Sequence, residues 1–186
     1  MPQTSSTFLD ELGNAARGCL ALLMGNRQAA THFDFSQRGL VGSIIAFLFA
    51  SALMAFGPHL FGFSSAPGDA TQALLLGGVL FLIQLAIAWL VLRQMGRLDG
   101  FVPFLVADNW ATFFTSFLSL GLLMFGGPAD IIFIMIGIVV IIVEVNIARL
   151  VVTLAPLQIA MFIVAQLVAS SIGLLLLGSM VPVPPV

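Results

Sequence analysis

Long apolar tracts separated by short polar connectors fill most of the 186-residue chain. Most tracts are near the ~20 residues with which a helix crosses the hydrocarbon core of a bilayer. The tract from Ile131 to Leu177 is too long for one crossing, and because its only charged residues are Glu144 and Arg149, the chain is expected to turn near them. The pattern predicts an all-α, polytopic transmembrane helical bundle of five spans, at about 39–57, 71–92, 103–125, 131–148 and 154–177, with Pro156 as an alternative start of the fifth.

An amphipathic segment precedes the five spans. Thr7 and Asp10 fit a capping box, apolar residues then recur at helical spacing, and Gly25 fits the glycine that follows a helix. The resulting helix, over about 8–24, is predicted to lie in the membrane interface. Packing against the protein's own bundle is the alternative. The expected organisation is a cytoplasmic N-terminal region at 1–38, a five-span domain at 39–178 and a proline-rich, non-cytoplasmic tail at 179–186.

The basic residues set the expected orientation. All six are arginine, and all six fall on one side of a five-span arrangement. Because positive residues concentrate in cytoplasmic connectors, this side is expected to be cytoplasmic, with the N-terminus inside and the C-terminus outside. The expected location is the inner (plasma) membrane. The six residues are Arg17, Arg27, Arg38, Arg93, Arg97 and Arg149.

Composition narrows the function classes. The chain is 60% hydrophobic and 8% charged, against roughly 25% charged residues in soluble domains. Its net charge of −2 argues against binding to nucleic acid, which calls for a basic patch. The single cysteine, Cys19, cannot form an internal disulfide. His32 and His59 fall on opposite sides of the membrane in this arrangement, so they cannot be the two axial ligands of one haem. We predict no catalytic, cofactor-binding or metal site.

Several polar residues lie within the spans near their cytoplasmic ends. Asp108 and Glu144 are each about five residues inside, or roughly 7–8 Å at ~1.5 Å per residue. A charge in lipid is costly, so we expect Arg149 or Arg93 to neutralise one of these carboxylates, with a proton or ion site as the alternative. Trp89 and Trp110 fit an aromatic belt at the same level. The candidate polar cluster comprises Asp108, Asn109, Glu144, Asn146, Arg149, Arg93 and Gln158.

A second polar feature follows one face of the third span. Asp108 is succeeded by Thr112, Thr115, Ser116 and Ser119 at helical spacing. This candidate polar stripe either lines a polar path or holds helices together by hydrogen bonds. Nearer the middle of the membrane, the strongly polar groups are Gln84 and Gln166.

The layout resembles small bacterial five-span members of the Yip1-domain family. The resembling features are the cytoplasmic N-terminal region, the sequence Phe-Asp-Phe-Ser-Gln-Arg-Gly at 33–39 before the first span, Asp-Asn-Trp at 108–110, and the run from Asn146 to Leu154 before the fifth span. The resemblance covers about residues 8–178. It implies an integral-membrane helical bundle without enzymatic chemistry, and it supplies no catalytic residues to transfer.

Three functions remain open from the sequence. The leading hypothesis is a non-enzymatic, Yip1-like inner-membrane protein that acts through lipids or a protein partner. The second is a small oligomeric transporter or channel that uses the polar stripe of the third span. The third is an accessory subunit of a membrane complex. Membrane lipids are the expected partners, with a protein partner or homo-oligomer as a further hypothesis, and no cofactor is expected.

Overall fold

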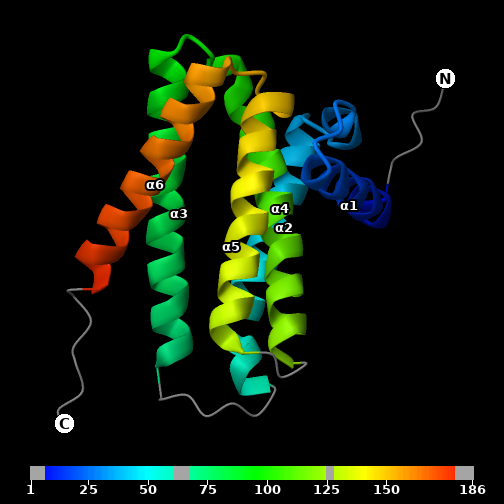
Figure 1. Ribbon diagram of the computed structural model, residues 1–186. Coiled ribbons are helices and arrows are strands. Elements are labelled where there is room, and N and C mark those ends of the chain that lie inside the picture. The colour runs from blue at the N-terminus through cyan, green and yellow to red at the C-terminus, as the bar shows by residue number, and fades with distance from the viewer. Residues whose placement is uncertain (1–6, 61–67, 125–127, 179–186) are drawn as a thin grey trace.

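The computed structural model describes residues 7–60, 68–124 and 128–178, and these residues form helices without any strand. Five helices are long and apolar enough to cross a membrane, which confirms a multi-pass helical membrane protein. The helices run alternately up and down (Figure 1). They are α1 (Phe8–Leu23), α2 (Gln37–Leu60), α3 (Asp69–Gln94), α4 (Phe101–Met124), α5 (Ala129–Asn146) and α6 (Pro156–Gly178), with short turns η1 (Ala29–His32), η2 (Leu98–Gly100) and η3 (Ile147–Val151), the last a turn of π-helix.

The observed helix limits lie within a few residues of the predicted spans. Pro103 was expected to open the third span, but α4 begins two residues earlier at Phe101. A proline is tolerated there because the N–H groups of the first turn have no partner within the helix. α2 continues beyond the predicted end of the first span to Leu60. The proline-rich tail at 179–186 lies outside the described residues.

α1 has the helix ends that the sequence predicts. The backbone N–H of Asp10 donates to Thr7 Oγ1 at 3.3 Å, and that of Thr7 donates to Asp10 Oδ2 at 2.9 Å, which completes the capping box. Gly25 has a φ of +66° and closes a Schellman turn after the helix. α1 packs against α4 and α5, as the alternative interpretation held. Its position in a membrane interface stays a prediction.

The five long helices divide into two groups. α2 packs closely on α4, and α5 lies against α4, whereas α3 pairs mainly with α6 along the other edge of the molecule (Figure 1). Small residues make the close approaches: Ala46 and Ala107 are at most 1% exposed in the first group. In the second group, a Cβ added to Gly173 would come within 2.8 Å of Leu80 Cδ2.

The aromatic-belt interpretation is wrong for one of the two tryptophans. Trp110 is 1% exposed and contacts three phenylalanine rings, so it belongs to the core rather than to a lipid-facing belt. Trp89 is 40% exposed, as a belt residue would be, and the guanidinium of Arg93 lies 5.0 Å from its ring centre.

Arg97 lies in the connector between α3 and α4 and bonds to the connector between α5 and α6, at the arginine-bearing end of the bundle. Its Nη2 donates to Val152 O at 2.6 Å and to Thr153 Oγ1 at 2.8 Å, and its Nη1 donates to Thr153 O at 2.9 Å. Thr153 has a φ of +58°, a left-handed conformation that costs free energy in a residue other than glycine. The Arg97 guanidinium therefore stabilises the strained turn between α5 and α6.

Replacing Arg97 with alanine is expected to lower the free energy of unfolding by about 2–4 kcal/mol, because two carbonyl oxygens lose charge-assisted donors. Unfolding by sodium dodecyl sulfate in mixed micelles measures this loss. Arg97→Lys is the matched control, since an ammonium keeps the charge but cannot span the three acceptors, and it should restore less than half of the loss. A change below about 0.5 kcal/mol for Arg97→Ala, as at an ordinary surface position, would contradict this role.

Candidate functional site: a carboxyl pair between the helix groups

Two acidic side chains meet where the two groups of helices face each other. Asp108 lies in the second turn of α4, and Glu144 lies two residues before the end of α5. Their carboxyl groups are hydrogen-bonded to each other. Two carboxyl groups can form such a bond only if one of them supplies a proton. A proton shared by the two carboxyl groups would lie between α4 and α5.

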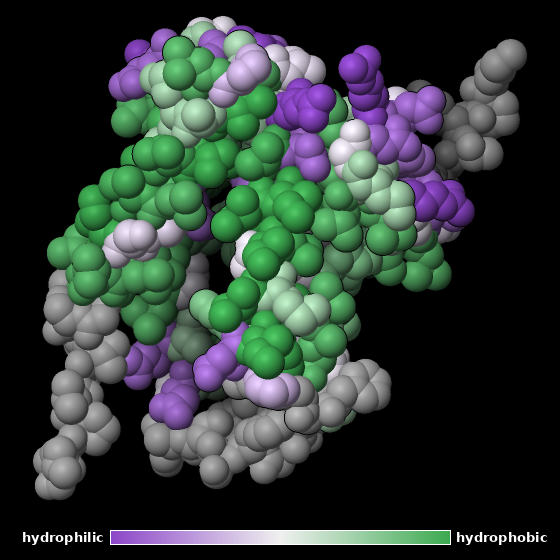
Figure 2. All heavy atoms as spheres, viewed as in Figure 1, coloured by the Kyte–Doolittle hydropathy of each residue, from purple (hydrophilic) through white to green (hydrophobic). Residues whose placement is uncertain are grey.

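The carboxyl pair faces a cavity of about 120 Å³ between α3, α4, α5 and α6. The space-filling view shows the hollow that separates the α3–α6 pair from the rest of the molecule, with apolar side chains over most of its walls (Figure 2). Three further polar side chains line this cavity: Gln84 from α3, and Gln166 and Ser170 from α6. We call Asp108, Glu144, Gln84, Gln166 and Ser170 the cleft residues.

Hydrogen bonds connect the cleft residues of α3 and α6. Gln84 Nε2 donates to Ser170 Oγ at 3.0 Å, and Ser170 Oγ donates to the backbone oxygen of Gln166 at 2.8 Å. Gln166 Oε1 is enclosed and has no hydrogen-bond partner among the described residues. The cavity that the carboxyl pair lines is thus also lined by a glutamine whose amide oxygen has no partner among the described residues.

The predicted neutralisation of these acids by arginine is wrong. Among the residues that the structure describes, no ion pair is seen at Asp108 or Glu144, whereas Arg97 pairs with exposed Asp99. Arg93 lies over the Trp89 ring, and Arg149 is exposed to the outside of the bundle. Arginine can reach the interface through its long stem, so neither Arg93 nor Arg149 needs a carboxylate inside the bundle.

The rest of the candidate polar cluster is dispersed over three separate contacts. Fully buried Asn109 points to a different side of α4, toward α2, where its Nδ2 donates to Ser43 Oγ at 3.1 Å. Asn146 Nδ2 donates to Leu22 O at 2.8 Å and so fastens α1 to the end of α5. Gln158 Oε1 accepts from the backbone N–H of Ala155 at 3.0 Å and caps α6. Each of these three side chains makes a structural hydrogen bond, and the buried Oδ1 of Asn109 has no partner among the described residues.

The candidate polar stripe does not line one continuous path. Thr115 Oγ1 donates to Ala111 O at 2.8 Å within its own helix and borders an apolar cavity under α1. Ser116 borders a different cavity, between α2, α3 and α4. Thr112 and Ser119 are half-buried. None of the four hydroxyl residues of the stripe lines the cavity that Asp108 and Glu144 line.

The sequence indicates some of the cleft residues but not their meeting. Gln84 and Gln166 are recognisable as polar groups near mid-depth, and Asp108 and Glu144 as acids closer to one end. The packing of α3 beside α6 brings Gln84 and Gln166 to the cavity of the carboxyl pair. The residue pattern of a single helix does not indicate this packing. Ser170 was not singled out, because serine is common in spans. No group of metal ligands occurs among the described residues.

Comparisons with family models, with curated proteins and with solved structures find no match for this chain. The resemblance to the Yip1-domain family therefore stays a prediction, and the chain is identified, from its five apolar helices, as a multi-pass helical membrane protein.

Proposed function

We propose that this chain is a non-enzymatic membrane protein of the transporter class that binds and releases a proton at Asp108 and Glu144. The observation that carries the proposal is the direct contact between these two carboxyl groups inside a cavity of the membrane-spanning bundle. Ionisable groups inside spans are rare because they are costly, and they commonly belong to proton relays or ion pathways.

The surroundings of the pair support exchange of the proton. The cavity of about 120 Å³ is much larger than the ~10–15 Å³ that one water molecule needs, so it has room for a short chain of water. Gln166, another lining residue, has a buried amide oxygen with no partner among the described residues. Within the described ranges, no arginine forms an ion pair with either carboxyl group, so no permanent counter-ion fixes the charge of the pair. These features suit a group that changes protonation state better than a fixed structural ion pair.

Dicyclohexylcarbodiimide tests this proposal directly. It adds to a protonated carboxyl group, and where water is scarce the adduct rearranges to a stable N-acylurea of unchanged mass. At pH 7.5 we expect Asp108 or Glu144 to gain one reagent mass, read by mass spectrometry of intact and digested protein. The Asp108→Asn/Glu144→Gln double variant should lose this labelling, because neither position then carries a carboxyl group.

Asp130→Asn is the matched control, because Asp130 is an exposed acid at the start of α5, far along the helix from Glu144. Its labelling should equal that of the wild type. If the wild type gains no more reagent than the Asp108→Asn/Glu144→Gln double variant, the carboxyl pair is not protonated as proposed.

A second candidate function is action through a protein partner, as in the Yip1-like and accessory-subunit hypotheses. The observation that favours it is the small buried share of α3 and α6, whose most apolar windows are only 6% and 11% buried within the chain. Cysteines placed on their outer faces, at Leu75 and Leu175, would crosslink to the partner in native membranes. Absence of any crosslinked species at both positions would count against this candidate.

A further inference from the structure

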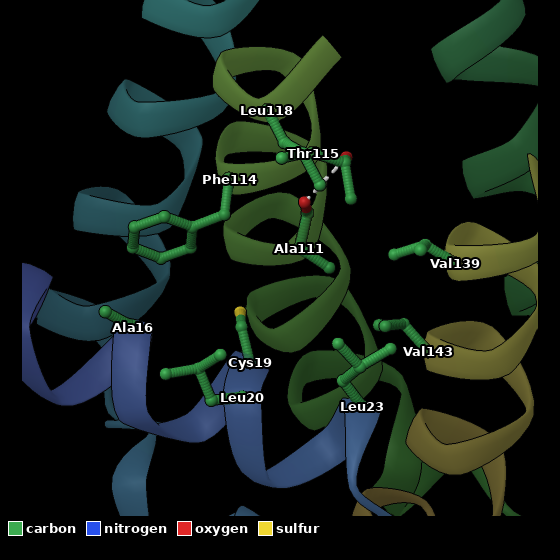
Figure 3. A pocket seen from close by; sticks show the side chains of 10 residues that line it. All are labelled: Ala16, Cys19, Leu20, Leu23, Ala111, Phe114, Thr115, Leu118, Val139 and Val143. Atoms are coloured by element: carbon green, nitrogen blue, oxygen red, sulfur yellow. Dashed lines mark hydrogen bonds between the residues drawn. The ribbon is translucent and has the colours of Figure 1, made fainter. Parts of the chain in front are cut away.

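A second cavity lies at the arginine-bearing end of the molecule, under α1. It has a volume of about 280 Å³ and is bounded by α1, α4 and α5. Figure 3 shows side chains of the three helices around one space, with Cys19 and Leu20 from α1, Phe114 from α4 and Val139 from α5. This cavity is separate from the one that holds the carboxyl pair, and none of the cleft residues lines it.

The walls of this cavity offer no free hydrogen-bond donor other than the weak thiol of Cys19. The one hydroxyl on its lining, that of Thr115, is occupied by Ala111 O. Burial raises the pKa of the Cys19 thiol to about 12, so this group stays neutral at physiological pH. An occupant must therefore be apolar along its whole length. A peptide segment does not meet this requirement unless it is already helical, because its backbone groups would be unsatisfied.

An exposed apolar strip of α1 adjoins the cavity. Leu9, Leu20 and Met24 are 73%, 57% and 79% exposed and lie on one side of the helix. Leu20 belongs both to this strip and to the cavity lining, so the cavity opens where the strip faces outward. Apolar surface of this kind on an amphipathic helix is stabilised by contact with acyl chains.

Positive charge accompanies the strip. Exposed Arg17 lies three residues before Leu20, and its only hydrogen bond among the described residues goes to Asn14 Oδ1 at 3.4 Å. Exposed Arg27 follows Met24 by three residues and has no partner in the described part of the chain. The two acids of α1 are in its first turn, where Asp10 is held by Thr7 and its pKa is lowered by those hydrogen bonds. The charged residues that follow the first turn of α1, up to Arg27, are thus both basic.

We propose that the cavity under α1 binds one acyl chain of an anionic phospholipid whose phosphate lies against Arg17 and Arg27. The apolar walls take the chain, and the two guanidinium groups select the headgroup by charge. This site lies within a protein that crosses the bilayer, so lipid reaches the opening laterally. The proposal is independent of proton binding at the carboxyl pair.

Tryptophan fluorescence tests the site, because bromine on an acyl chain quenches an indole that it approaches. Trp89→Phe leaves Trp110 as the single tryptophan, and Trp110 stacks on Phe114 of the cavity wall with ring centres 6.1 Å apart. In vesicles of brominated phosphatidylglycerol mixed with unlabelled phosphatidylcholine, we expect quenching to saturate at a lower mole fraction than with brominated phosphatidylcholine. Arg17→Gln and Arg27→Gln should each reduce this preference by roughly fivefold, and together they should nearly remove it.

A cavity-filling variant separates this site from ordinary surrounding lipid. Val139→Phe, which projects a ring into the cavity, should weaken quenching by either brominated lipid. Ala73→Phe is the matched control, because Ala73 lines the cavity of about 220 Å³ between α2, α3 and α4. Equal quenching by the two brominated lipids in the Trp89→Phe protein would overturn the headgroup assignment. The acyl-chain site would be overturned if the Val139→Phe and Ala73→Phe proteins were quenched equally. Size-exclusion chromatography must first show that both variants are folded.

Discussion

After an external acid pulse, the interior of proteoliposomes that contain the Glu144→Gln variant is expected to acidify no faster than that of protein-free vesicles. The interior of vesicles with the wild-type protein should acidify faster. The glutamine keeps the size of the side chain and can still hydrogen-bond to Asp108, but it cannot take up or release a proton at neutral pH. Asp108→Asn should have the same effect because both carboxyl groups act as one unit. An entrapped pH-sensitive dye measures the initial rate.

Asp130→Asn controls for the loss of one negative charge, and it should acidify at the wild-type rate. The proposal of proton transport is contradicted if Glu144→Gln and Asp108→Asn acidify like the wild type. It is also contradicted if both variants misassemble, since the carboxyl pair would then be a structural contact between α4 and α5. Size-exclusion chromatography in mild detergent distinguishes the second outcome from true loss of transport.

Replacing Trp110 with alanine is expected to lower the free energy of unfolding by about 3–5 kcal/mol. The indole is 1% exposed and contacts Phe113 edge-on at 5.7 Å and Phe114 at 6.1 Å between ring centres. It also contacts Phe8 of α1 at 6.1 Å. The substitution leaves a cavity that these rings cannot fill without moving, and it removes one contact that holds α1 on the bundle. Unfolding in mixed micelles of increasing sodium dodecyl sulfate measures the loss.

Trp89→Ala provides the matched control, because Trp89 is 40% exposed and is contacted by Arg93. Its loss should cost no more than about 1 kcal/mol, the size of an exposed cation–π contact. Similar losses for the two tryptophan variants would show that Trp110 does not hold the core. Limited proteolysis should in addition cut the Trp110→Ala protein sooner between α1 and α2, because α1 is less firmly docked.

The helices themselves could be predicted closely from the chain. Hydropathy over a window of about 20 residues reflects a local requirement, since each span must match the thickness of the bilayer by itself. The capping box at Thr7 and the glycine turn at Gly25 are equally local, and both occur as predicted. The prediction for Pro103 differs by two residues, within the usual scatter of helix ends.

The grouping of polar side chains could not be predicted in the same way. Residues at one depth in different spans share a level, but they meet only if their helices are neighbours and are rotated toward each other. Asn109 follows Asp108 directly, yet it turns to Ser43 on α2 while Asp108 turns to Glu144 on α5. Successive residues of a helix project about 100° apart, so equal depth alone does not make a cluster.

The sequence by itself determined a multi-pass bundle of five apolar helices with all its arginines on one side, because span length and charge placement depend on each segment alone. Only the tertiary structure decided that Glu144 meets Asp108 rather than Arg149. The same holds for Arg97, which bonds to the turn after α5, and for the amides of α3 and α6, which face the carboxyl pair. The physical reason is that helix packing, set by small residues such as Gly173 and by the rotation of each helix, determines which side chains touch.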